Sequence, residues 1–143
     1  MEFALVAVPL FFLVLGAIAS GLNIMAMGVL NVATKEAGRK IQIGAIRGTS
    51  DSEIRTLICG YVSALVPSCQ NALMIYAASG ATFSGVAAAT VVGTAFSPAG
   101  FSPGSAGSSV VLQVACNSPF GMSLTNATNF MLTATTVFRN EPL

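Results

Sequence analysis

The sequence predicts an α+β protein in which a long N-terminal hydrophobic helix packs against a small head with a second short helix and an antiparallel β-sheet. No charged residue occurs from Phe3 to Thr34, and about 18 apolar residues are enough to cross a bilayer as a helix. From Ala72 onward, apolar segments rich in β-branched residues are separated by turn residues, which is typical of short strands. We expect a helical unit over residues 1–48 and a head domain over residues 49–143.

The composition points away from an ordinary soluble domain. Hydrophobic residues make up 54% of the chain and charged residues 8%, against roughly 25% charged in an average soluble protein. The span from Thr56 to Phe138 also lacks charge. Either hydroxyls and amides form the head surface, or identical copies or glycans cover it. With a net charge of +1, the chain lacks the excess of basic residues that is typical of nucleic-acid-binding proteins.

The residue inventory argues against catalysis. The chain has no His and three Cys, so the usual general base and the commonest metal ligand are missing. No glycine-rich stretch carries the lysine of a phosphate loop. We therefore expect no enzyme activity, no catalytic residue, no metal site and no cofactor.

The first helix is predicted from Phe3 to about Ala45, with Gly44 or Gly48 as its stop. Forty-odd residues at 1.5 Å each span about 65 Å, well beyond a bilayer core. Pro9 removes one backbone hydrogen bond and is expected to kink or loosen the helix. Basic residues suit its C-terminal end; they are Lys35, Arg39, Lys40 and Arg47.

Small residues recur four positions apart within the apolar run. Gly16 pairs with Ser20 and Ala17 with Gly21, and such pairs let another helix approach closely.

Three interpretations of this helix stay open. Ala17-Ile18-Ala19 resembles a signal-peptide cleavage site, but the start is acidic and the apolar run continues beyond it. A single-pass anchor leaves Glu2 unexplained. By the positive-inside rule, the basic residues after the helix would also place the C-terminal part of the chain in the cytoplasm. In a filament helix, Glu2 would pair with the terminal amine of a neighbouring subunit, because a buried charge is tolerable only when paired.

A second helix is predicted from about Asp51 to Leu65. Ser50 and Glu53 have capping-box spacing, and Pro67 is expected to end the helix. The apolar face comprises Ile54, Leu57, Ile58, Tyr61, Val62 and Leu65.

The cysteines suggest a disulfide that pins this helix. Cys59 and Cys69 flank the helix end, and an exported location would supply oxidising conditions; a pair of buried free thiols is the alternative. Cys116 is then either a buried hydrophobe or an inter-subunit thiol.

The remaining segments read as strands and loops. Residues 97–109 are rich in Pro and Gly and should form an exposed loop. Asn126 begins a formal glycosylation sequon, and residues 140–143 should form a polar turn. The candidate strands are Leu73–Tyr76, Val86–Val92, Val110–Val114 and Met131–Phe138, and the inner face of their sheet should pack on the amphipathic part of the long helix.

With these residues in view, the chain resembles TadE-like pseudopilins of the tight-adherence branch of type IV filament systems. The likeness extends over nearly the whole chain, through the second helix with Cys59 and then Cys69. The motifs that carry it are the opening Glu2-Phe3-Ala4-Leu5-Val6-Ala7-Val8-Pro9, the segment Phe101-Ser102-Pro103-Gly104-Ser105-Ala106-Gly107 and the ending Phe138-Arg139-Asn140-Glu141-Pro142.

The resemblance implies a structural role. A prepilin peptidase would remove a short leader, Glu2 would be the assembly acid, and assembly machinery would move the subunit from the inner membrane into a filament on the bacterial surface. We expect a helical homopolymer used in adhesion or surface contact. A minor pseudopilin that primes or caps another pilin is the alternative, and a monomeric anchored binding domain is a third hypothesis.

Overall fold

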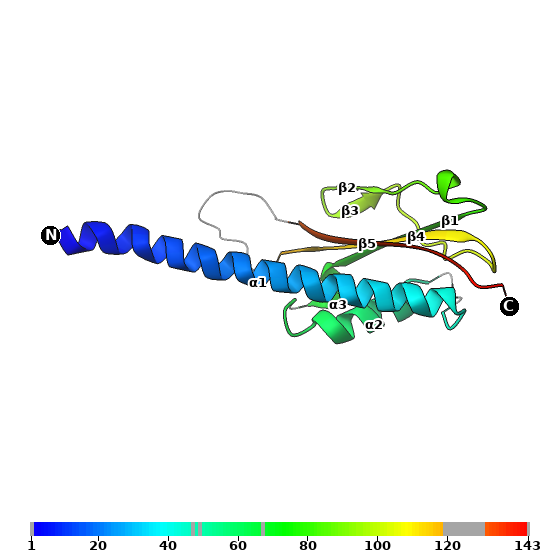
Figure 1. The fold of residues 1–143 in the computed structure, drawn as a ribbon, viewed down its shortest axis with the longest axis horizontal. Helices are drawn as coiled ribbons and strands as arrows, with labels where there is room; N and C mark the ends of the chain where they lie inside the picture. The colour runs from blue at the N-terminus through cyan, green and yellow to red at the C-terminus, as the bar shows by residue number, and fades with distance from the viewer. Residues whose placement is uncertain (1, 47, 49, 67, 119–130, 143) are drawn as a thin grey trace.

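The computed structural model describes residues 2–46, 48, 50–66, 68–118 and 131–142, with side chains from Val6 onward. It has the predicted α+β architecture, in which a long N-terminal helix continues into a small head (Figure 1). The elements in chain order are α1 (Glu2–Gln42), α2 (Ser52–Val62), α3 (Cys69–Ala72), β1 (Leu73–Gly80), the 3₁₀ turn η1 (Phe83–Gly85), β2 (Thr90–Val92), β3 (Ala95–Ser97), β4 (Ser109–Asn117) and β5 (Met131–Arg139).

Helix α1 ends as the sequence predicts, at a glycine. Gly44 adopts a φ of +69°. Glycine takes up this left-handed conformation at little steric cost because it has no Cβ. The amide of Ala45 donates to the carbonyl of Lys40 and that of Gly44 to the carbonyl of Ile41. These two bonds form a Schellman motif, which satisfies carbonyls that the helix end leaves open. The helix runs unbroken through Pro9.

Helix α2 begins within one residue of the predicted Asp51, but its first turn is capped differently. Its N-cap is Asp51, which makes no side-chain capping bond, so the predicted capping box of Ser50 and Glu53 is wrong. The Ser50 hydroxyl instead accepts from the amide of Ser52 at 3.3 Å. The Asp51 carboxylate forms an ion pair with the guanidinium of Arg55 at 2.5 Å. The helix ends at Val62, before the predicted Leu65, and Pro67 lies outside the described residues.

The main sheet is antiparallel with strand order β1-β4-β5. In its register Val114 lies opposite both Ile75 and Ala134. Strand β4 is buried on both faces, which explains its continuous apolar sequence.

A small second sheet pairs β2 with β3. The predicted strand Val86–Val92 is therefore too long, because within it only residues 90–92 pair with another strand. Strand β3 was not predicted, and it takes Ser97 from the predicted loop. That loop is also not wholly exposed, since Pro103 is buried.

The main sheet separates two apolar layers (Figure 1). One face packs on α1 and α2, as expected for the amphipathic part of the long helix. This cluster joins Leu30 and Ala37 of α1, Ile58 of α2, and Leu112 and Leu132 of the sheet. The opposite face carries Tyr76, Val111 and Ala115, which pack against Ala89 and Phe96.

Candidate assembly helix and its junction with the head

Helix α1 has an uncovered half and a packed half. From Val6 to Met25 every side chain is exposed or half-buried. The consecutive residues Leu10 to Leu15 are all exposed, and at 3.6 residues per turn they surround the helix axis. The packed half buries residues spaced three or four apart, which form one helical face; they are Ala26, Leu30, Ala33, Ala37 and Ile41.

Within the described residues, α1 is the one helix that is long and apolar enough to cross a membrane, by length and composition. An apolar surface on all sides suits lipid or neighbouring apolar helices rather than water. This single apolar helix near the N-terminus points to membrane anchoring.

The predicted assembly residues lie on the uncovered half. The backbone of Glu2 belongs to α1, while its side chain is outside the description. Pro9 is exposed, and Ser20 donates to the carbonyl of Gly16 at 2.8 Å. A Cβ placed on Gly21 would meet no atom within 4 Å. The small-residue surface is thus open to another helix.

The packed half approaches the sheet closely. A Cβ at Gly38 would lie 2.9 Å from Cγ2 of Thr136 and 3.0 Å from Cε1 of Phe138, so glycine permits this spacing. This contact makes the packed half part of the head. The head also reaches the last turn of the uncovered half, where Ser118 after β4 donates to Oδ1 of Asn23 at 2.5 Å.

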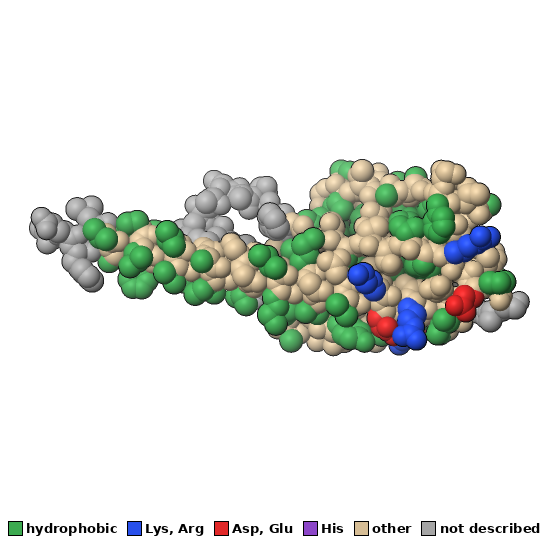
Figure 2. Space-filling view, viewed as in Figure 1, with side chains coloured by type: hydrophobic (Ala, Val, Ile, Leu, Met, Phe, Trp, Pro, Cys, Tyr) green, Lys and Arg blue, Asp and Glu red, His purple; other side chains and the backbone are tan. Residues whose placement is uncertain are grey.

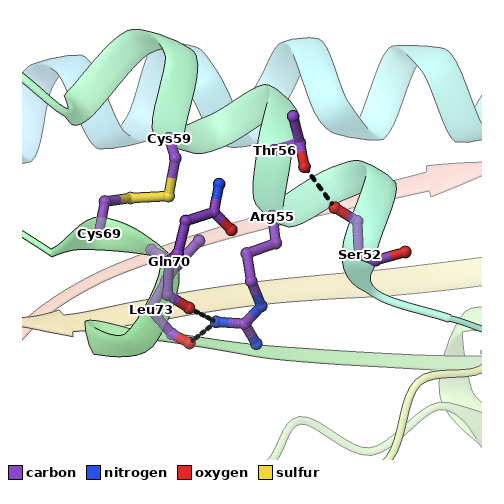
Figure 3. Close-up of a disulfide and its surroundings, with 7 residues drawn as sticks. All are labelled: Ser52, Arg55, Thr56, Cys59, Cys69, Gln70 and Leu73. Carbon is purple, nitrogen blue, oxygen red and sulfur yellow. Dashed lines mark hydrogen bonds between the residues drawn. A yellow bond between two sulfur atoms is a disulfide. The ribbon is translucent and has the colours of Figure 1, made fainter.

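The expected disulfide joins Cys59 of α2 to Cys69 of α3 (Figure 3). Arg55, one turn earlier on α2, points toward the same junction. Its Nη1 donates to the carbonyls of Gln70, at 2.9 Å, and Leu73. The bridge and the guanidinium together hold α2 against the start of β1, a role for Arg55 that the sequence did not reveal.

Cys116 lies in β4, is free and has only 1% of its surface exposed. Burial raises the pKa of its thiol, which keeps the thiol protonated and unreactive. Its position suits the buried-hydrophobe interpretation and leaves it out of reach of a neighbouring subunit.

The C-terminal residues do more than the predicted polar turn. Asn140 is 7% exposed, and its Nδ2 donates to the carbonyls of Pro103, at 2.9 Å, and Ser105, at 3.1 Å. The amide of Glu141 donates to the carbonyl of Gln42 at the end of α1. One buried amide therefore connects two of the segments on which the family resemblance rests.

The described residues hold no group of three or more His, Cys, Asp or Glu side chains that could bind a metal ion. A cavity of about 420 Å³ lies between the end of α1 and the C-terminal residues, and its lining includes Gln42, Ser105 and Glu141. Glu141 is the one titratable residue in that lining, so the cavity offers no acid–base pair. Asn126, the sequon residue, lies outside the described residues.

The fold and the helix define a class of protein: an α+β head carried on one N-terminal apolar helix. Within that class, the family model described as TadE-like protein matches residues 1–39. From Glu2 onward the match lies within α1, and it confirms the resemblance seen in the opening residues. The chain has no match among curated proteins or among solved structures.

Proposed function

We propose that this chain is a structural pilin-like subunit that polymerises through α1 into a type IV, tight-adherence-type extracellular filament used in adhesion or surface contact. The observation that carries the proposal is the uncovered half of α1, which is exposed or half-buried from Val6 to Met25 and apolar on all sides from Leu10 to Leu15. Lipid of the inner membrane would cover this surface first. Neighbouring copies of α1 would cover it in the filament at the bacterial surface.

The likeness to TadE-like proteins supports this role, because it suggests a pilus-associated pseudopilin with a membrane-anchoring helix. A structural subunit needs no catalytic group, in keeping with the residue inventory. The implied partners are a prepilin peptidase and the pilus assembly machinery.

Glu2 is the proposed assembly residue. A carboxylate is costly among apolar helices unless a cation pairs with it. The terminal amine of an adjacent subunit would supply that cation, and the pair would fix the axial register. The open surface at Gly16, Ser20 and Gly21 would let the two helices approach closely.

The test replaces Glu2 by alanine in the producing cell. Because Glu2→Ala removes only the pairing charge, the protein should stay in the membrane fraction while filaments disappear from electron micrographs and from sheared surface material. Glu53→Ala, which removes an exposed carboxylate from the first turn of α2, is the matched control and should leave filaments intact. Normal filaments from Glu2→Ala would contradict the proposal.

A minor pseudopilin that primes or caps another pilin is the second candidate, because the family likeness fits that role equally well. The uncharged span from Thr56 to Phe138 favours an abundant subunit whose head surface is largely covered by neighbours. Mass analysis of purified filaments separates the two roles. The major-subunit proposal requires this chain to dominate the mass, and a trace amount beside another pilin would assign it to priming.

A further inference from the structure

Arg55 uses its charge within the head rather than toward solvent. Charged side chains are sparse on the face of the molecule shown in Figure 2, and those that are visible stand at the surface of the head. The Arg55 side chain is 23% exposed. Its Nη2 donates to Oδ2 of Asp51 at 2.5 Å, and its Nη1 donates to the backbone carbonyls of Gln70 and Leu73. One side chain therefore connects three points of the chain.

The carbonyls that Arg55 binds belong to α3 and to the start of β1. Helix α3 has four residues, and the last carbonyls of a helix lack a partner within it. Gln70 is one of these residues, so its carbonyl is open to an outside donor, and cations suit a helix C-terminus. Because a guanidinium carries several N–H donors, it can bind the Leu73 carbonyl as well. Arg55 thus fixes α3 and the start of β1 to α2.

The two cysteines of the disulfide lie next to the two sides of this contact (Figure 3). Cys59 stands one turn after Arg55 on α2, and residues four apart lie on the same side of a helix. Cys69 directly precedes Gln70. The bonds from Arg55 to α3 therefore also bring the side chains of the two cysteines toward each other.

Each side of the junction also has contacts to the core that do not involve the disulfide. On α2 the side chains of Ile54, Ile58 and Val62 are at most 1% exposed and belong to the cluster shared with α1. Strand β1 pairs with β4 from Leu73 to Gly80. The helix and the strand are thus held in the head independently, and Arg55 joins them at the corner between them.

We propose that Arg55, supported by Asp51, is a positioning residue for the oxidation of Cys59 and Cys69. Its bonds dock α3 on α2 in the reduced chain, and the disulfide then locks a junction that has already formed. This positioning does not depend on polymerisation. In the competing order of events, the disulfide forms first and Arg55 finds its carbonyls only afterwards.

Oxidised glutathione serves as the oxidant in the test. The thiolate of one cysteine attacks a glutathione sulfur and expels one glutathione thiolate, and the thiolate of the other cysteine then attacks the mixed disulfide and expels the second. The two protons that leave the cysteines end on the two glutathione thiolates, so one protein disulfide and two reduced glutathiones form. Because the second attack is intramolecular, the equilibrium measures the effective concentration of one protein thiol at the other.

The first measurement uses the parent chain in detergent micelles, with the disulfide reduced by dithiothreitol. Hydrogen exchange is followed at the amides of Ala72 and Leu73, which donate to the carbonyls of Ser68 and Cys69, and at Val114 of the central strand. We expect all three amides to stay protected. Loss of protection at Ala72 and Leu73 alone would show that the disulfide creates the junction, and loss at all three would show that the head needs the disulfide to fold. Either result overturns the proposal.

The second measurement is the effective concentration in glutathione mixtures. Arg55→Met keeps an unbranched stem without the guanidinium and should lower this concentration about ten- to hundredfold, the range for a hydrogen bond to a charged group. Arg139→Met is the matched control, because Arg139 also donates to a backbone carbonyl, that of Gly107 at 3.0 Å. Arg139 lies opposite Ser109 and Leu73 opposite Cys116, about 23 Å apart along β4. The control should match the parent chain.

An unchanged effective concentration in Arg55→Met would overturn the positioning role. An equal fall in Arg139→Met would also overturn it, because the effect would then reflect a general loss of stability. Thermal unfolding of the oxidised forms establishes that each variant is folded. If Arg55→Met does not fold, the exchange measurement on the reduced parent chain decides the proposal by itself.

Discussion

The two halves of α1 form one continuous helix, yet they meet the rest of the protein in opposite ways. The first half presents large side chains such as Phe11 and Leu13 on all sides and touches little of the head. The second half turns small residues, among them Ala33, Ala37 and Gly38, toward the sheet. Side-chain size and placement, rather than helix formation, therefore decide which part of α1 belongs to the head and which part is free for other partners.

The largest expected contrast comes from truncating one leucine in each half. Leu30 is fully buried, so Leu30→Ala should lower the free energy of unfolding of the head by about 2–5 kcal/mol through lost burial and a cavity. Leu13 is 70% exposed, and Leu13→Ala should leave head stability unchanged. Urea unfolding of the full chain in detergent micelles, followed by the near-UV circular dichroism of buried Tyr76, measures both.

Equal losses from the two leucine variants would show that the uncovered half contributes to the head after all. If Leu30→Ala were as stable as the parent protein, Leu30 would not belong to the core, and the packed half of α1 would not contribute to the head as described.

A smaller contrast separates two glycines. Gly38→Ala places a Cβ 2.9 Å from Cγ2 of Thr136, and such overpacking should cost about 1–3 kcal/mol. A Cβ at Gly21 would meet no neighbour within 4 Å, so Gly21→Ala should leave head stability unchanged. The same unfolding measurement compares them. A gain in stability for Gly38→Ala would mean that the sheet can move away from α1 at little cost.

The smallest contrast concerns two hydroxyls that bond to their own helix. Thr34 is buried and donates to the carbonyl of Leu30 at 2.7 Å, so Thr34→Val should cost about 1 kcal/mol. Ser20 makes the same kind of bond to Gly16 while exposed, and Ser20→Ala should not change head stability. Thermal unfolding in micelles resolves the difference, and an equal effect of both variants would contradict it.

Helix α1 was predictable because its signals are local. The uncharged run, the cations near the C-terminus and Gly44 all act within the helix or its last turn, so the predicted end lies within one turn of Gln42. The start of α2 was also predicted to within one residue, but the same local reasoning gave the wrong cap. Ser50 and Glu53 have the right spacing, but the partner that engages Asp51 is Arg55, and Arg55 is in turn held by carbonyls from α3 and β1.

The strands show where pairing overrides propensity. The predicted strand Leu73–Tyr76 ended before Ala77, Ala78 and Gly80, which are poor strand formers. Pairing with β4 nevertheless extends the strand to Gly80, opposite Ser109. Conversely, Val86 and the three alanines that follow it belong to the predicted strand Val86–Val92 but pair with no other strand, and the strand there begins only at Thr90.

Asn140 could not be assigned from the residues alone. A polar residue near the end of the chain ordinarily reads as solvated, and its partners, Pro103 and Ser105, are far away in the sequence. The available signal was that both segments belong to the motifs on which the family resemblance rests. That signal does not show that the two segments contact each other.

The tie between Glu141 and Gln42 also has a practical use. It places the last described residues at the tip of the head, opposite the N-terminal end of α1 (Figure 1) and about 60 Å along the helix from Glu2. A fluorophore or epitope attached there would be displayed outward and away from the bare helix. Labelled subunits could then be followed from the membrane to the cell exterior while the surface proposed for polymerisation stays unmodified.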